Sequence, residues 1–131
     1  MEIVVKISWA LLGVLHVMPS LVLFSPGLVE KLYSVDPSGD VGILLTHRAA
    51  MFFTVVVVSV FAIFDPSTRR LASLVVAISM TGFLIVYARA GMPTGALRSI
   101  AIADLVGLLP LFIVLFAAWA YRFHASNDYL Q

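Results

Sequence analysis

Long uninterrupted apolar stretches constrain this chain more than any other feature. Four of them, at residues 3–24, 43–64, 71–88 and 96–121, are about as long as the ~20 residues that a helix needs to cross the ~30 Å apolar core of a bilayer. Inside lipid the backbone must satisfy its own hydrogen bonds, so the β-branched run at 55–58 is also expected to be helical. The pattern predicts an all-α, multi-pass protein of the cell membrane, in which residues 1–131 form a single four-helix bundle domain.

The composition agrees with a lipid environment. Hydrophobic residues make up 62% of the chain and charged residues 11%, whereas soluble domains usually carry about a quarter charged residues. The net charge of +1 leaves no basic surface for nucleic acid, so the lipid bilayer is the expected partner. The chain has no cysteine, which excludes disulfides, thiolate metal sites and thiol nucleophiles.

The first connection is longer than the others and carries a pattern of its own. Apolar residues recur at helical spacing on one side of residues 27–34, and the charged pair Glu30 and Lys31 lies off that side. This arrangement predicts a short amphipathic interfacial helix in the first loop.

Four spans place both ends of the chain on the same side of the membrane. Lysine and arginine divide evenly between the two sides, and discounting Arg48, which lies inside a span, leaves a slight excess on the side of the termini. By the positive-inside rule the termini are then expected in the cytoplasm. Arg89 and Arg98, at the ends of the third and fourth spans, are expected to contact lipid headgroups.

Polar side chains gather in one half of the predicted bundle. By helical rise, Asp104 lies about 12 Å inside the fourth span, and the other members of the cluster fall in the same half of the bilayer. A charge near the bilayer centre costs about 2.5–3.5 kcal/mol on insertion scales, so these groups are expected to face the bundle interior. The candidate polar cluster or ligand-binding set is His16, His47, Arg48, Tyr87 and Asp104.

Within this cluster, Arg48 is the expected partner of Asp104, because a guanidinium keeps its charge and can grip a carboxylate with two bonds. Such a pair can fix helix packing without any ligand. His16 can bond a neighbouring carbonyl, and His47 can extend toward the headgroups. Alternatively, the two histidines and Asp104 could bind a metal, pass protons or hydrogen-bond a quinone-like ligand. Their spacing matches no metal motif, so no metal is predicted, and the cofactor is unknown.

Two functions are compatible with this pattern. No P-loop, G-x-G-x-x-G, G-x-S-x-G or metalloprotease motif occurs, so the sequence disfavours an enzyme without excluding one. The leading prediction is a protein that acts through helix–helix contacts, as an accessory subunit of a larger membrane complex or as a homo-oligomer. The alternative is binding or transport of a small apolar molecule or lipid by the polar cluster, favoured by Pro19 and Pro110 within spans. Small residues suited to close helix contact are Gly13, Ser20, Ala49, Ala50, Ser79, Gly82, Ala101, Ala103 and Gly107.

Three segments resemble a group of small four-span bacterial integral membrane proteins of unassigned function. They are "FSPGLVEKLYSVD" after the first span, "THRAAMFF" in the second and "LRSIAIADLVGLLPL" in the fourth. The resemblance implies the four-span fold but no catalytic residues. Some proteins of this group carry the name phosphopantetheine adenylyltransferase. That activity belongs to a soluble nucleotide-binding α/β fold with a T-x-G-H motif, which this chain lacks.

Overall fold

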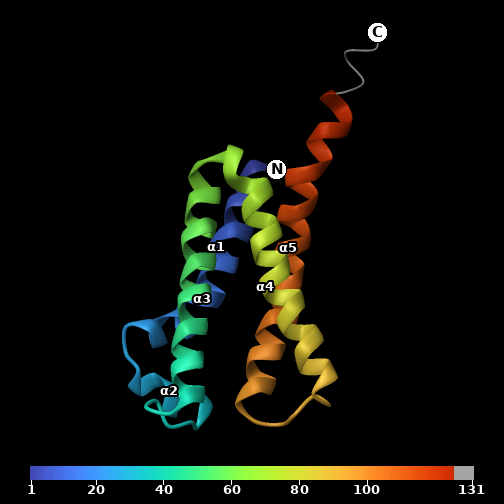
Figure 1. Ribbon diagram of the computed structural model, residues 1–131. Coiled ribbons are helices and arrows are strands. Elements are labelled where there is room, and N and C mark those ends of the chain that lie inside the picture. The colour runs from blue at the N-terminus through green and yellow to red at the C-terminus, as the bar shows by residue number, and fades with distance from the viewer. Residues whose placement is uncertain (126–131) are drawn as a thin grey trace.

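The computed structural model describes residues 1–125, with side chains described through Ala120. Within that range the chain is helical and contains no strand, so the predicted all-α four-helix bundle is confirmed (Figure 1). The short helix α2 and the connections on both sides of it lie at the end of the bundle opposite the N-terminus. The elements are α1 (Glu2–Ser20), η1 (Leu21–Leu23), α2 (Gly27–Tyr33), α3 (Asp40–Phe64), η2 (Pro66–Thr68), α4 (Arg69–Arg89) and α5 (Ala96–Ala125).

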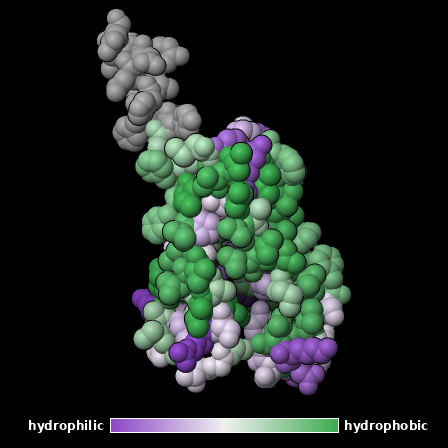
Figure 2. Space-filling model, turned by 180° about the vertical axis from the view of Figure 1, so that it is seen from behind, coloured by the Kyte–Doolittle hydropathy of each residue, from purple (hydrophilic) through white to green (hydrophobic). Residues whose placement is uncertain are grey.

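Four helical stretches are long and apolar enough to cross a membrane, namely Glu2–Leu23, Asp40–Phe64, Pro66–Arg89 and Ala96–Ala120. The third stretch begins five residues before the expected start at residue 71. The reason is local, because the Asp65 carboxylate accepts a hydrogen bond from the Ser67 amide at 2.8 Å and starts the turn η2. Figure 2 shows hydrophobic side chains over the middle of the molecule and hydrophilic ones gathered toward its two ends, as a bilayer-spanning protein requires.

Helix α1 forms the centre of the bundle and packs against both α3 and α5, while α4 packs mainly on α5. Trp9 and Leu12 of α1 are fully buried in the main core. Val55 of α3, Val76 of α4 and Val114 of α5 close around them. In lipid such a core is held by close packing rather than by exclusion of water, so its shape complementarity matters most.

A second, smaller core attaches α2 to the bundle. Val29 of α2 is fully buried against Val22 and Ala49, while Glu30 and Lys31 are exposed. The predicted amphipathic helix is therefore present, and its apolar face covers the end of the bundle. This packing places the last residues of α2 over the space between α1 and α5.

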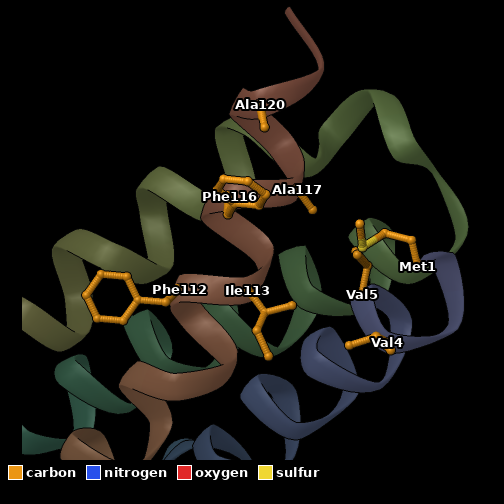
Figure 3. A pocket seen from close by; sticks show the side chains of 8 residues that line it. All are labelled: Met1, Val4, Val5, Phe112, Ile113, Phe116, Ala117 and Ala120. Carbon is orange, nitrogen blue, oxygen red and sulfur yellow. The ribbon is translucent and has the colours of Figure 1, made fainter. Parts of the chain in front are cut away.

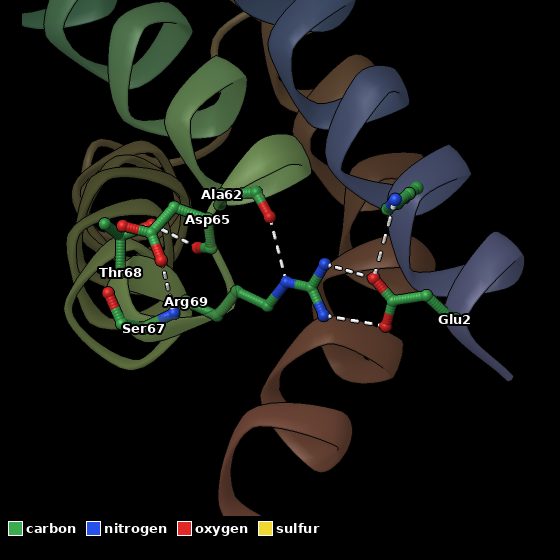
Figure 4. A network of polar contacts seen from close by, with 7 residues as sticks. Glu2, Ala62, Asp65, Ser67, Thr68 and Arg69 are labelled. Atoms are coloured by element: carbon green, nitrogen blue, oxygen red, sulfur yellow. Dashed lines mark hydrogen bonds and ion pairs between the residues drawn. The ribbon is translucent and has the colours of Figure 1, made fainter.

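An ion pair joins three helices at the end that carries the N-terminus (Figure 4). The Arg69 guanidinium donates to both carboxylate oxygens of Glu2, at 2.9 and 2.6 Å, and its Nε donates to the Ala62 carbonyl at 2.9 Å. Lys6 lies 3.9 Å from the same carboxylate. The contacts tie the start of α1 to the end of α3 and the start of α4.

Beside this ion pair, a wide apolar groove of about 750 Å³ runs between the start of α1 and the later part of α5 (Figure 3). Val4 and Val5 line one wall, and Phe112, Ile113 and Phe116 line the other. None of the described residues that line the groove has a charged or hydrogen-bonding side chain.

Candidate functional site

A cavity of about 380 Å³ lies at the opposite end of the bundle, where α2 covers α1 and α5. Its walls are mostly apolar, and His16 and Asp104 are the titratable side chains on its inner walls. Four helices contribute to the lining: Leu15, His16, Met18 and Pro19 from α1, Lys31, Leu32 and Tyr33 from α2, Phe52 from α3, and Ala96, Ser99, Ile100, Ala103 and Asp104 from α5.

His16 is positioned by its own helix. Its Nδ1 lies 2.8 Å from the Leu12 carbonyl, one turn earlier in α1, and since a carbonyl can only accept, Nδ1 carries the proton. The side chain is 2% exposed, and its Nε2 has no hydrogen-bond partner among the described residues. In the neutral imidazole this Nε2 is a buried, unused hydrogen-bond acceptor.

Asp104 lies on α5 and is 8% exposed. No described side chain or backbone group makes a hydrogen bond or ion pair with its carboxyl group, and none joins it to His16. Burying a carboxylate without a partner costs roughly several kcal/mol, so the Asp104 carboxylate needs either a bound proton or a hydrogen-bond donor from a ligand. The predicted meeting of separate spans therefore occurs, with two polar groups left unsatisfied at one cavity.

The end of α2 adds polar groups at the mouth. Burial raises the pKa of the Tyr33 phenol, so its hydroxyl stays protonated at neutral pH. Lys31 and Ser99 line the same mouth and are exposed. The cavity thus has a polar entrance, apolar walls and two acceptor groups in its interior.

No family model matches this chain, and no curated protein or solved structure matches it. The resemblance to small four-span bacterial proteins stays a prediction.

The expected ion pair between Arg48 and Asp104 is wrong. Both side chains are described, and no ion pair forms between them. The guanidinium instead lies over two aromatic rings, 5.1 Å from the centroid of Phe52 and 4.7 Å from that of Phe83. Phe52 is also a neighbour of His16, with 5.8 Å between the two ring centroids. Arg48 therefore points into the space between α3 and α4.

The remaining candidates lie outside the cavity. His47 is exposed, as its alternative role near the headgroups requires. The Tyr87 hydroxyl donates to the Pro93 carbonyl at 3.0 Å and closes the connection from α4 to α5. Arg89 and Arg98 are exposed at the same end of the bundle, and their contact with lipid headgroups stays a prediction.

The metal alternative finds no ligand set in the part of the chain that the structure describes. No three histidine, aspartate or glutamate residues lie close enough there to hold an ion. His16 and Asp104 share the cavity, whereas His47 does not line it.

Sequence reasoning missed Phe52 and Tyr33 as members of the site. Phe52 follows Arg48 by four residues and so lies on the same face of α3, which is a usable signal for a contact between their side chains. Tyr33 belongs to the apolar side of the predicted amphipathic helix, but nothing in the pattern indicates which part of the bundle that side would cover.

Proposed function

We propose that this protein binds a small amphipathic molecule with an amine or another cationic, hydrogen-bond-donating group in the cavity between α1, α2 and α5. One observation carries the proposal: His16 Nε2 and the Asp104 carboxylate belong to buried residues of one cavity and have no hydrogen-bond partner among the described residues. An ammonium group supplies both the donors and the charge that these groups need. Apolar walls, including Leu15, Met18 and Ile100, suit a short hydrocarbon portion.

This proposal corresponds to the alternative prediction from the sequence, which was binding or transport of a small molecule by the polar cluster. The leading one, contact with a partner subunit or a second copy, was based on small residues available for such contacts. Gly13, Ala49, Ala101 and Gly107 are buried within the single chain, so they support its own packing. That role stays a prediction.

The test compares three probes with the same chain length: octylamine, octanol and octanoate. Each is titrated into the protein in dodecyl maltoside micelles and followed by calorimetry. Octylamine should bind at least about tenfold more tightly than octanoate. Asp104→Asn should reduce octylamine affinity about tenfold, because the amide keeps the shape and loses the charge. Asp40→Asn, at an exposed acid in the first turn of α3, is the matched control and should change nothing.

A second pair of variants guards against misfolding. His16→Ala should weaken binding, whereas His47→Ala, at an exposed site outside the cavity, should not. Ser99→Leu at the exposed mouth should obstruct entry without disturbing the core. Equal binding of octylamine and octanoate, or unchanged binding by Ser99→Leu and Asp104→Asn, would rule out the proposed site.

We also propose that the termini face the cytoplasm, on the basis of the charge distribution. The cavity lies at the other end of the bundle and would then open away from the cytoplasm. Because the chain has no cysteine, a single introduced one reports orientation. In intact cells a membrane-impermeant maleimide should label Ser38→Cys, in the connection after α2, and should label Ser67→Cys only after lysis. The reverse pattern would invert the orientation.

A further inference from the structure

A second cavity, of about 310 Å³, lies between α3 and α4 and is separate from the one that holds His16. The two helices diverge from their connection at η2, and this groove lies where they have separated (Figure 1). Among the residues that the structure describes, Arg48 is the only charged one that lines it. The other lining residues are apolar or small: Met51, Phe52, Ile78, Ser79, Gly82, Phe83 and Val86.

Arg48 has no carboxylate within ion-pair distance in the described part of the chain. Its guanidinium makes neither an ion pair nor a hydrogen bond there, although its flat faces are held by Phe52 and Phe83. Stacking on rings uses the faces of the guanidinium and leaves its N–H edges free. Those edges match two oxygens of a phosphate or carboxylate. A cation inside a bilayer without such a counter-ion is strongly unfavourable.

The depth of the groove in the bilayer indicates which kind of anion can reach Arg48. Phe83 precedes the end of α4 at Arg89 by six residues, so Arg48 lies about 9 Å from that helix end. A span of 24 residues is about 36 Å long, so the guanidinium is only a few ångströms inside the ~30 Å apolar core. The rim residues Met51, Ile78 and Val86 are exposed and apolar. An anion with acyl chains fits this position.

We propose that the groove between α3 and α4 binds an anionic phospholipid, with the phosphate at the Arg48 guanidinium and an acyl chain lying along the two helices. The site is distinct from the amine site, although Phe52 lines both. Its occupant comes from the bilayer itself and needs no soluble ligand.

Native mass spectrometry of the purified protein tests this, with dioleoyl phosphatidylglycerol and dioleoyl phosphatidylcholine added in turn. The wild type should retain phosphatidylglycerol about tenfold better than phosphatidylcholine, and Arg48→Gln should abolish that preference. Arg89→Gln removes an exposed arginine from the same end of the bundle and should leave the preference within about twofold of the wild type.

Gly82→Leu provides an independent variant that keeps Arg48 in place. A Cβ at Gly82 meets no atom within 4 Å, so a larger side chain can enter the groove without a clash at its base. It should abolish retention of phosphatidylglycerol even if Arg48→Gln fails to fold. Retention by both variants at the wild-type level would overturn the proposal. A second result would also overturn it. If excess inorganic phosphate displaced the lipid, and the Gly82→Leu variant still bound phosphate, the groove would be a site for the free anion.

Discussion

Replacing Trp9 with alanine should lower the free energy of unfolding by about 3–5 kcal/mol, the range typical of large-to-small changes at buried aromatic residues. Trp9 is fully buried in the main core, to which all four long helices contribute side chains. Acyl chains solvate apolar groups as well as the protein interior does, so the loss comes from packing contacts and from the cavity left behind. Unfolding with a rising fraction of sodium dodecyl sulfate in mixed micelles, followed by circular dichroism, measures the change.

Trp119→Ala is the matched control, because it removes the same side chain from the surface of α5. Trp119 is 44% exposed, and its indole donates to the Ser73 hydroxyl at 3.3 Å. Its loss should lower the free energy of unfolding by about 1 kcal/mol or less. Equal losses in the two variants would mean that α1 is not the packing centre of the bundle.

The number, type and approximate limits of the long helices could be predicted because hydropathy alone sets which segments cross lipid. Depth could also be predicted, since helical rise places His16 and Asp104 at similar levels in antiparallel spans, and the structure brings both to one cavity. The amphipathic helix over residues 27–34 was visible for the same reason, as its apolar spacing is periodic.

The rotation of each helix about its axis could not be predicted. Spans that are apolar all round carry little information about which face meets which neighbour, and this is why Arg48 was assigned to Asp104 and instead lies over Phe52 and Phe83. The pair of Glu2 and Arg69 was missed for another reason. In the sequence Arg69 belongs to a polar connection, and it is the turn η2 before it that directs its side chain toward Glu2 of α1.

Gly42→Ala should destabilise the protein by about 3 kcal/mol and also weaken binding of octylamine. A Cβ at this position would lie 2.6 Å from the Cα and 2.7 Å from the carbonyl carbon of Pro37, and close to the Asp36 carbonyl oxygen as well. These are backbone atoms, which a rotamer change cannot move aside. The same substitution at an unobstructed helix interior would stabilise by roughly 0.5–1 kcal/mol, so the expected sign is reversed. Micelle unfolding and calorimetry measure the two effects.

The turn before α3 cannot readily yield to the added methyl group. The Asp36 carboxylate accepts hydrogen bonds from the Ser38 amide at 2.9 Å and the Ser38 hydroxyl at 2.7 Å, which hold the pKa of Asp36 below its usual range and keep the turn closed at neutral pH. The strain should therefore move the connection that follows α2, and with it Tyr33 at the mouth of the cavity.

Gly39→Ala is the control within the same turn, because its Cβ would come no closer than 3.9 Å to the Asp36 carbonyl oxygen. Gly39 is the N-cap of α3, where glycine is preferred to alanine, so this variant should cost about 1 kcal/mol or less and bind octylamine normally. If Gly42→Ala behaved as Gly39→Ala does, the first turn of α3 would not be packed against this connection, and α2 would not be held over the cavity by it.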